Sequence, residues 1–400
     1  MKIGIDARFY GVAGPGRYIS CLISELEKKD KTNEYVIFVT KEGSKKYHPQ
    51  NANFKKWISD YPWYSVQEQT SFLIDLMRAR LDLLHVPHFN IPILYPKKFV
   101  VTIHDLIMHE ADSQTATTKS PMLFTFKKLV YRFVLNWAAM KSKKIIVPSE
   151  TVKKEILENI KAVKDQKIVV TYEGVGENLL KLAPSDKHVI STQLEEKGIR
   201  EQYFLYVGSS YPHKNLNTLV VSFKDLLNDN PSIKVQLVIA GKVDDFSQRL
   251  AGFVHALKLD HKIIFAAKYA ENNYVSDKDV AYLYKGALAY VFPSLKEGFS
   301  ITPLEAQSFG VPVLLSDIPT HKEVFGESVE YFQPKSTVEL TKKMQVIVKD
   351  KELREDLIKR GNENIKKYSW SEMADKTLEI YNNTLSNSKT SNLSYEEVSK

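Results

Sequence analysis

The chain has 400 residues, more than one hydrophobic core usually serves, so we expect two domains. Its 43% apolar and 26% charged residues are typical of a globular protein and exclude bulk disorder and collagen-like repeats. A single cysteine, Cys21, excludes an internal disulfide, and no Cys and His spacing is typical of a zinc site. Residues 1–185 carry 28 Lys and Arg against 19 Asp and Glu, whereas residues 186–400 carry 28 against 29. The basic first half suggests an anionic partner: an acidic lipid surface, a phosphorylated acceptor or nucleic acid.

Short apolar runs alternate with helical patterns in the first half of the chain. The predicted strands are Lys2–Ala7, Tyr35–Thr40, Leu83–Pro87, Phe99–His104, Lys144–Pro148 and Lys167–Tyr172. The predicted helices between them are Arg17–Lys29, Val66–Arg80, Pro121–Lys141 and Ser149–Ile160. Continuous runs of Val, Ile and Leu indicate strands that are covered on both faces, as in a parallel sheet between helices.

The second half repeats this alternation. Its predicted strands are Tyr203–Val207, Val235–Ala240, Lys262–Ala266, Ala289–Pro293 and Val313–Ser316. The α/β pattern therefore predicts two doubly wound, Rossmann-like domains, over residues 1–185 and 200–369, with the boundary in the polar stretch 177–202. Helical patterns follow over residues 338–367, with a break, and over residues 370–385. The tail, residues 386–400, is poor in apolar residues, and we expect it to be disordered.

Ligands bind at the carboxyl ends of strands in open parallel sheets, so polar residues that follow strands are candidates for a site. The segment 208–215 follows the strand Tyr203–Val207 and contains Gly208 and, at the start of the next helix, Lys214. An ammonium group at a helix amino terminus favours a diphosphate, because charge and helix dipole act together.

The segment 297–305, EGFSITPLE, follows the strand Ala289–Pro293 and opens a helix. Glu297 lies before the helix and Glu305 lies about one turn inside it. Gly298 lets the backbone approach a ligand, and the N–H groups of residues 298–300 favour an anion. Because a carboxylate repels a diphosphate, the two glutamates are better suited to accept hydrogen bonds from sugar or ribose hydroxyls.

The first half offers weaker signals. The glycine-rich residues 11–18 follow the first strand but lack the third glycine of a dinucleotide-binding fingerprint. His104 ends a strand, where it is able to bind a sugar hydroxyl or polarise a leaving group, although a structural role is the alternative. His85 and His88 have no matching carboxylates, so we predict no metal site.

No apolar run approaches the ~18 residues of a membrane span, and the first residues read as a strand rather than a signal peptide. We therefore expect a cytoplasmic protein. Peripheral contact with the inner face of an anionic membrane remains open, because residues 117–144 combine apolar and basic side chains. The alternative for this stretch is a helix that packs on the sheet and exposes a basic face.

Residues 297–305 resemble the motif of the retaining GT-B glycosyltransferases of family 4, also named glycosyl transferases group 1. Lys214 and residues 6–8 and 14–18 extend the resemblance, which covers residues 1 to about 385 and is strongest to mannosyltransferase-like enzymes of surface polysaccharides. The resemblance implies that two domains face each other across a cleft, the first binding the acceptor and the second the donor. It also implies that the helix 370–385 crosses back onto the first domain.

The resemblance assigns roles to matching positions. The donor, a nucleotide diphosphate sugar, would contact residues of the second domain: Gly208, His213, Lys214, Glu297, Gly298, Phe299, Ser300 and Glu305. In this set Glu297 and the amides after it hold the sugar and diphosphate, Glu305 holds the ribose, and Lys214 holds the diphosphate. His104 would approach the donor sugar, and the loop with Gly14 and Gly16 would close over the phosphates. We place Arg8 and Asp105 on the acceptor side.

Glu297, Lys214 and His104 are thus the predicted catalytic residues, with no cofactor and no metal. The expected reaction moves a hexose, of mannose or glucose type, to a saccharide or lipid-linked acceptor in surface polysaccharide or glycan synthesis. A sugar-nucleotide epimerase and a non-catalytic sugar-nucleotide-binding protein remain alternatives. Nucleic acid is not expected as a partner, because the aromatic residues are not interleaved with basic ones and no recognition motif is present.

Overall fold

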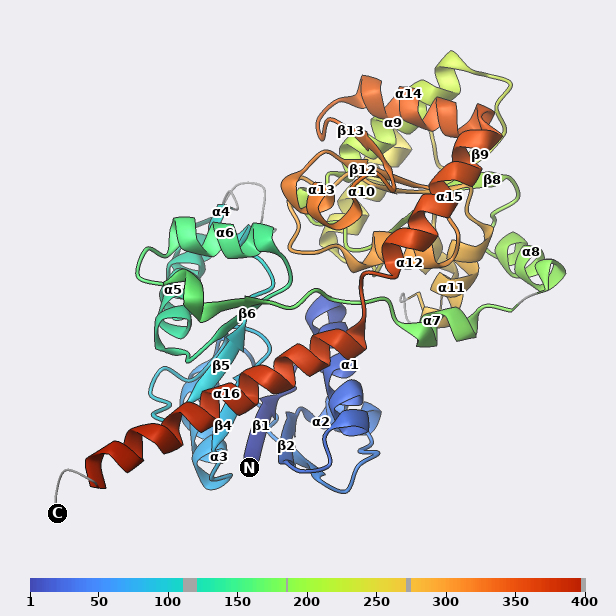
Figure 1. Cartoon of the computed structure of the whole chain (residues 1–400). Helices are drawn as coiled ribbons and strands as arrows, with labels where there is room; N and C mark the ends of the chain where they lie inside the picture. The colour runs from blue at the N-terminus through green and yellow to red at the C-terminus, as the bar shows by residue number, and fades with distance from the viewer. Residues whose placement is uncertain (111–120, 185, 271–274, 397–400) are drawn as a thin grey trace. The chain divides into compact units, whose positions relative to one another are not determined.

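The structure is a computed structural model that describes residues 1–110, 121–184, 186–270 and 275–396 (Figure 1). The chain divides into two compact units. The first unit contains residues 1–110, 122–173 and the carboxyl-terminal residues from Ser369 on, and the second contains Gly174–Tyr368. The chain thus leaves the first unit after Glu173, earlier than the domain end at residue 185 expected from the sequence.

The first unit is built on a parallel sheet of seven strands. In chain order they are β1 (Lys2–Asp6), β2 (Glu34–Val39), β3 (Phe54–Ile58), β4 (Leu83–Val86), β5 (Phe99–Thr102), β6 (Ile145–Val147) and β7 (Ile168–Val170). The strand order across the sheet is β3-β2-β1-β4-β5-β6-β7. Strands β4, β5 and β6 are buried along their whole length, which explains their uninterrupted apolar sequences.

Helices connect these strands. They are α1 (Ala13–Lys29), α2 (Lys41–Lys46), the π-helix η1 (Glu68–Phe72), α3 (Leu73–Arg78), α4 (Ile107–Glu110), α5 (Pro121–Lys141), α6 (Glu150–Asn159), the 3-10 helix η2 (Asp165–Lys167) and α16 (Trp370–Glu396). Ser149 shows how such a helix begins, because its hydroxyl accepts a hydrogen bond from the N–H of Val152 at the start of α6.

The last helix, α16, belongs to the first unit and packs against α1 (Figure 1). Lys29 of α1 forms an ion pair with Asp375, and the hydroxyl of Tyr381 lies 2.5 Å from Nδ1 of His85, a buried residue of β4. The other ring nitrogen of His85 lies 2.8 Å from Oγ1 of Thr102 on β5. A polar chain therefore ties α16 to the two central strands.

The second unit is built on a parallel sheet of six strands. They are β8 (Gln202–Val207), β9 (Val235–Ala240), β10 (Ile263–Phe265), β11 (Ala289–Phe292), β12 (Val313–Ser316) and β13 (Glu330–Phe332), in the order β10-β9-β8-β11-β12-β13. The helices of this unit are α7 (Glu177–Leu182), α8 (Lys187–Glu196), η3 (Pro212–Lys214), α9 (Leu216–Asp229), α10 (Asp245–Ala256), η4 (Ala266–Tyr269), α11 (Asp277–Gly286), α12 (Ile301–Ser308), α13 (Pro319–Phe325), α14 (Thr337–Lys349) and α15 (Lys351–Ile365).

The strands predicted from the sequence are all present, and two further strands, β3 and β13, are added at sheet edges. The break expected within residues 338–367 falls at Asp350, which ends α14 and whose side chain accepts from the N–H of Leu353 at the start of α15. Residues 177–202, expected as a polar boundary, contain α7 and α8. Helix α16 continues to Glu396, where the sequence suggests a disordered tail, and residues 397–400 lie outside the described residues, as do residues 117–120 of the amphipathic stretch.

Candidate active site

The second unit has its topological switch point between β8 and β11. Strands β9 and β10 lie on one side of β8, whereas β11, β12 and β13 lie on the other. The loops that leave two such strands diverge to opposite faces of the sheet, which leaves room for a ligand at the carboxyl ends. The segments singled out in the sequence, residues 208–214 and 297–305, follow these two strands.

Gly208 lies directly after β8 with a φ of 154°, a value that side chains rarely adopt. A Cβ at this position would lie 2.7 Å from the hydroxyl of Tyr206, and a Cβ at Gly241 would lie 2.2 Å from the carbonyl oxygen of Gly208. Two glycines therefore allow the chain after β8 and the chain after β9 to approach closely.

Lys214 ends the short helix η3 and is held by its neighbour Asn215. Asn215 has a left-handed backbone with φ 57°, and its Nδ2 donates to the carbonyl oxygens of Pro293 (3.0 Å) and Pro334 (2.6 Å). Asparagine tolerates this conformation better than most residues. These bonds join the start of α9 to the loop after β11, and so place Lys214 opposite that loop.

Lys214 and Glu297 form a largely buried ion pair. Nζ of Lys214 lies 2.6 Å from Oε1 of Glu297, and the two side chains are 15% and 9% exposed. Nζ also lies 5.0 Å from the ring centroid of Phe292. Charged side chains are rarely buried to this extent without a partner. Two of the three predicted catalytic residues are therefore brought together in the structure.

Glu297 is ionised in this site. Burial by itself favours the neutral acid, but the positive charges of Lys214 and His213 outweigh it and lower the pKa of Glu297. His213 lies beside Lys214 on η3, and its carbonyl oxygen accepts from the N–H of Leu295 at 2.7 Å. The site thus presents a carboxylate, which accepts hydrogen bonds, beside an ammonium group, which binds anions.

The motif 297–305 spans a loop and the helix α12. Gly298 and Phe299 lie in the loop, Ser300 directly precedes α12 with a φ of 82°, and Phe299 is buried. Glu305 lies inside α12, is 2% exposed, and its Oε2 lies 3.2 Å from the hydroxyl of Tyr284. The structure therefore places Glu297 beside Lys214, and Glu305 deeper in the unit.

Two neighbouring residues of α13 contact this loop, and the sequence analysis does not identify them. The hydroxyl of Thr320 donates to the carbonyl oxygen of Glu297 (2.8 Å), and Nε2 of His321 lies 3.1 Å from Oγ of Ser300. His321 is fully buried, and burial lowers its pKa to about 4. The signal for them in the sequence is their position just after β12, the next strand of the sheet beyond β11.

His104 follows β5 in the first unit and is engaged at both ring nitrogens. Nε2 lies 2.9 Å from the carbonyl oxygen of Pro87, and Nδ1 lies 3.3 Å from Oε1 of Glu173. Burial alone would disfavour the imidazolium, but the hydrogen bond and the charge of Glu173 prevail and raise the pKa of His104. Tyr18 packs its ring edge against the imidazole at 4.8 Å.

Arg8, placed on the acceptor side by the sequence analysis, is 1% exposed. Its guanidinium donates two hydrogen bonds to Asp6 and one to Glu68, each within 2.9 Å. Asp105 accepts from the N–H of Ile107 at 2.9 Å and so starts α4.

The glycine-rich segment of the first unit is largely helical. Gly14 and Gly16 belong to the first turn of α1 rather than to the loop expected there. A Cβ at Gly16 would lie 2.4 Å from the carbonyl oxygen of Phe9, whereas a Cβ at Gly14 would meet nothing within 4 Å. Gly16 therefore serves the close approach of α1 to the chain that leaves β1.

The first unit has its own switch point between β1 and β4, and polar side chains gather after these strands. Phe9 stacks on Trp63 with 3.9 Å between ring centroids and on His88 with 4.9 Å. Within the described residues, four side chains here have buried polar atoms without a hydrogen-bond partner: Arg8 (Nη1), Trp63 (Nε1), His88 (Nδ1) and Asn90 (Oδ1 and Nδ2). We name these four residues and Phe9 the β1/β4 cluster. Such unpartnered groups are rare in native proteins.

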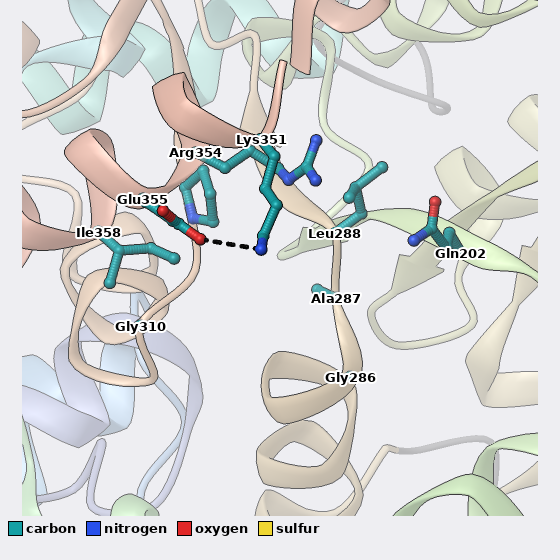
Figure 2. Close-up of a pocket in the computed structure, with 10 residues that line it drawn as sticks. Gln202, Gly286, Ala287, Leu288, Gly310, Lys351, Arg354, Glu355 and Ile358 are labelled. Carbon is teal, nitrogen blue, oxygen red and sulfur yellow. Dashed lines mark ion pairs between the residues drawn. The ribbon is translucent and has the colours of Figure 1, made fainter. Parts of the chain in front are cut away.

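A cleft of about 350 Å³ lies elsewhere in the second unit, at the amino ends of its strands (Figure 2). Gln202, Leu288 and Pro312, which precede or begin β8, β11 and β12, line it together with Lys351 and Arg354 of α15. Figure 2 shows Lys351 paired with Glu355 of the same helix, at 3.4 Å. Because ligands of such sheets bind at the opposite, carboxyl ends, this cleft is not part of the site.

Within the described ranges, no group of three or more His, Cys, Asp or Glu side chains is arranged to hold a metal ion. Nor does any helix in the described part of the chain have the length and apolar character needed to cross a membrane.

Comparison with known families identifies the chain. Residues 12–178 match the model named Glycosyltransferase Family 4, and residues 190–364 match the model named Glycosyl transferases group 1. The two matches together cover most of both units. The chain belongs to this glycosyltransferase family. The second match contains Lys214, Glu297 and the whole motif 297–305.

Curated relatives of this glycosyltransferase include enzymes of O-antigen synthesis. It is 28% identical over 312 residues to the O-antigen chain mannosyltransferase RfbU of Salmonella typhimurium, over 78% of this chain and 76% of that protein. It is 29% identical over 188 residues to O-antigen chain mannosyltransferase B of Escherichia coli, over 45% of each chain. These similarities support a role in polysaccharide synthesis.

Solved structures share the GT-B fold of this glycosyltransferase. Sucrose-phosphate synthase from Thermosynechococcus elongatus superposes with a TM-score of 0.74 at 17% identity, over 96% of this chain and 99% of that one. Anabaena Alr3699/HepE in complex with UDP and glucose superposes with a TM-score of 0.72 at 16% identity, over 96% and 100%. At these identities the similarity establishes the fold.

Proposed function

We propose that this glycosyltransferase moves a hexose, of mannose or glucose type, from a nucleotide diphosphate sugar to a saccharide or lipid-linked acceptor with retention of the anomeric configuration. The second unit binds the donor and the first unit binds the acceptor. The observation that carries the proposal is the buried pair of Lys214 and Glu297 at the β8/β11 switch point. It places one anion-binding group and one hydroxyl-binding group 2.6 Å apart.

When the donor binds, the diphosphate replaces Glu297 as the partner of the Lys214 ammonium group, and the carboxylate of Glu297 turns to the sugar hydroxyls. The bond between the anomeric carbon and the diphosphate oxygen then breaks, and the electron pair leaves with the diphosphate. Lys214 stabilises this growing negative charge in a largely buried site, where electrostatic interactions are strong. The acceptor oxygen attacks the same face of the sugar, and its proton passes to the departing diphosphate.

The direct test compares Lys214→Met with Lys285→Met, which alters an exposed lysine at the end of α11. We expect Lys214→Met to lower kcat for transfer by about 100-fold or more, because charge stabilisation at the leaving group is lost. Lys285→Met should transfer at the wild-type rate. The one-bond C1–H1 NMR coupling constant of the product reports retention, because it separates α from β anomers for mannose as well as for glucose. Full activity of Lys214→Met, or an inverted product, would contradict the proposal.

Thermal-shift measurements can distinguish between candidate donors. The curated relatives are mannosyltransferases, whereas the HepE structures contain UDP and UDP-glucose. We propose GDP-mannose or UDP-glucose, and the true donor should raise the melting temperature by mass action. We also propose that no metal is required, because Lys214 supplies the positive charge. Transfer that persists in excess EDTA is the expected result, and loss that Mg²⁺ or Mn²⁺ restores would contradict it.

For the acceptor we propose the β1/β4 cluster of the first unit. Aromatic faces and planar polar groups are suited to sugar rings, whose C–H faces stack while their hydroxyls form hydrogen bonds. The unpartnered atoms of Trp63, His88 and Asn90 offer donors and acceptors for these hydroxyls once the acceptor enters. Burial and the positive charges of His104 and Arg8 outweigh an interaction with the side chain of Asn90 and lower the pKa of His88 to about 3, so its ring is neutral at pH 7.

Asn90→Ala and Trp63→Phe test this assignment. Trp57→Phe is the control, because Trp57 lies on strand β3 and outside the β1/β4 cluster. Methyl α-mannoside serves as the probe acceptor, and donor hydrolysis serves as the acceptor-independent reaction. We expect the first two variants to raise the KM for the acceptor about tenfold, the loss of one or two hydrogen bonds, without slowing hydrolysis. Equal loss of hydrolysis and transfer would place the effect outside the acceptor site.

Finally, we propose that α5 of the first unit holds the enzyme at the cytoplasmic face of an anionic membrane. In the part of α5 whose side chains are described, Leu129 is 66% and Phe133 58% exposed, and Met140 is also exposed. Exposed Lys127 and Lys141 accompany them. Apolar side chains bordered by cations are suited to the interface of a bilayer with acidic lipids.

Vesicle sedimentation tests the membrane proposal. Binding to vesicles that contain phosphatidylglycerol, and little binding to phosphatidylcholine alone, is expected. Phe133→Glu should weaken the binding about tenfold, by adding a charge and removing buried apolar area. Val338→Glu on α14, an exposed apolar position in the second unit, should not. Equal binding of Phe133→Glu and the wild type would contradict the assignment of α5.

A further inference from the structure

Ser300 adopts a backbone conformation that its own side chain does not explain. Its φ of 82° and ψ of 72° are left-handed, which costs a residue with a Cβ conformational energy. A serine before a helix usually caps it, yet Ser300 makes no side-chain cap bond to α12. Its hydroxyl instead lies 3.1 Å from Nε2 of His321, on α13.

The hydrogen bonds of His321 fix which nitrogen carries the proton. Nδ1 lies 2.8 Å from the carbonyl oxygen of Ser316, which only accepts, so Nδ1 carries the hydrogen. The ring is fully buried, and burial lowers its pKa to about 4, so it is neutral at pH 7. Nε2 is then an acceptor, and the hydroxyl of Ser300 donates to it. His321 therefore donates a hydrogen bond to the end of β12 and accepts one from the loop before α12.

The first turn of α13 therefore holds both ends of the loop 297–300. Thr320 binds the carbonyl oxygen of Glu297, and His321 binds the side chain of Ser300. The carbonyl oxygen of His321 accepts a hydrogen bond from the hydroxyl of Tyr331. The imidazole of His321 packs against Phe292, with 5.8 Å between the ring centroids. These two contacts keep this turn in place.

We infer that His321 is a positioning residue of the donor site: its neutral imidazole accepts from Ser300, holds that residue in the left-handed conformation, and so presents Glu297 and the following amides to the donor. The inference rests on the proposed function for the meaning of donor binding. It makes a specific claim about Ser300, because a glycine adopts the same backbone without any help from a side chain.

Four variants test the link: His321→Asn, Ser300→Ala, Ser300→Gly and the double variant His321→Asn/Ser300→Gly. Asparagine retains a donor near the position of Nδ1 but loses the acceptor that Nε2 provides. We expect His321→Asn and Ser300→Ala each to raise the KM for the donor about tenfold, with a smaller change in kcat. Ser300→Gly should be less harmful than Ser300→Ala, although it removes more atoms. The probes are GDP-mannose and UDP-glucose.

The decisive result is rescue. The double variant should recover most of the donor affinity that His321→Asn loses, because glycine no longer needs the histidine. Thr320→Val is the matched control: it releases the other end of the loop, so Ser300→Gly should not rescue it. A double variant no better than His321→Asn alone, or Ser300→Gly as harmful as Ser300→Ala, would overturn the inference.

A second measurement keeps the inference separate from the proposed function. If the wild type binds neither probe, the proposed donor is wrong, but the urea unfolding midpoints of the same variants still decide the role of His321. Ser300→Gly should unfold at a higher midpoint than Ser300→Ala, and its effect should be strongly non-additive with His321→Asn. Additive effects of the two substitutions on the unfolding free energy would overturn the link.

Discussion

At the scale of single residues, the proposed donor site depends on a balance of buried charges. Lys214 and Glu297 each reduce the cost of burying the other. When the diphosphate of a donor pairs with Lys214, Glu297 needs other hydrogen-bond donors. The hydroxyls of a sugar provide them. We therefore expect the site to bind a ligand that carries both a diphosphate and a sugar more tightly than one that carries a phosphate alone.

Glu297→Gln tests this balance. The substitution keeps the shape but removes the charge, and leaves Lys214 as a mostly buried cation without a carboxylate. We expect the free energy of unfolding, measured in urea, to fall by about 3 kcal/mol. Transfer should fall about 100-fold. Glu352→Gln, at an exposed position in the first turn of α15, should change neither. A variant as stable and as active as the wild type would show that the pair is dispensable.

The pair of His104 and Glu173 predicts a pH dependence in the first unit. Because Glu173 raises the pKa of His104 above its ordinary value of 6.5, the charged histidine stabilises the folded state. This contribution is fully present below pH 6.5 and is lost as the pH rises through the raised pKa. Glu173→Gln should therefore be less stable than the wild type at pH 6, and the difference should shrink by pH 9.

Urea unfolding of the wild type and Glu173→Gln at both pH values measures that difference. Other titrating groups are common to the two proteins and cancel in the comparison. A stability difference that stays constant between pH 6 and pH 9 would mean that His104 does not titrate against Glu173.

At the scale of elements, α16 is held in place by residues that are far from it in the sequence. It follows the second unit in sequence but packs in the first, where Tyr381 is fully buried and contacts His85. Burial lowers the pKa of His85 to about 3, so its ring is neutral and depends on neutral partners. The hydroxyl of Tyr381 is one of them.

Tyr381→Phe should lower the free energy of unfolding by about 1–3 kcal/mol, because Nδ1 of His85 loses its partner in a fully buried site. Tyr269→Phe, at a half-exposed tyrosine of the second unit, should have little effect. Urea unfolding followed by far-UV circular dichroism measures both. Equal stabilities of the two variants would remove the polar link from the account of how α16 docks.

The two strands that the sequence does not reveal are both at sheet edges. In β3 the exposed residues Lys55 and Lys56 interrupt the apolar pattern, which is a common device to protect an edge from pairing with another chain. Strand β13 has three residues, too few to form a pattern. The central strands are predictable because burial on both faces demands continuous apolar residues, and an edge strand has no such demand.

The residues of the proposed donor site also differ in how far the sequence predicts them. Lys214 and Glu297 are predictable because each follows a buried strand within a recognisable segment. His321 is not, because its partner Ser300 is 21 residues away, and the two meet only after β12 has been laid beside β11. Arg8 is similar: Asp6 is its local partner, but Glu68 reaches it from the helix η1.

At the scale of the whole molecule, two parallel sheets repeat one principle. Each has a switch point, β1/β4 in the first unit and β8/β11 in the second, and each gathers its chemically capable side chains there. The second switch point carries the pair of Lys214 and Glu297, and the first carries aromatic and polar side chains beside Arg8, which is paired with Asp6 and Glu68. These groups fit the proposed transfer, in which Lys214 meets a diphosphate and the aromatic and polar side chains of the first unit meet the hydroxyls of a saccharide.

A crystal structure with a bound nucleotide diphosphate sugar would decide whether the β8/β11 switch point binds the donor through Lys214. We expect a diphosphate oxygen within hydrogen-bond distance of Nζ of Lys214, with Glu297 turned to the sugar hydroxyls. A nucleotide bound at the amino ends of the strands, beside Lys351 and Arg354, with the pair of Lys214 and Glu297 intact, would contradict it.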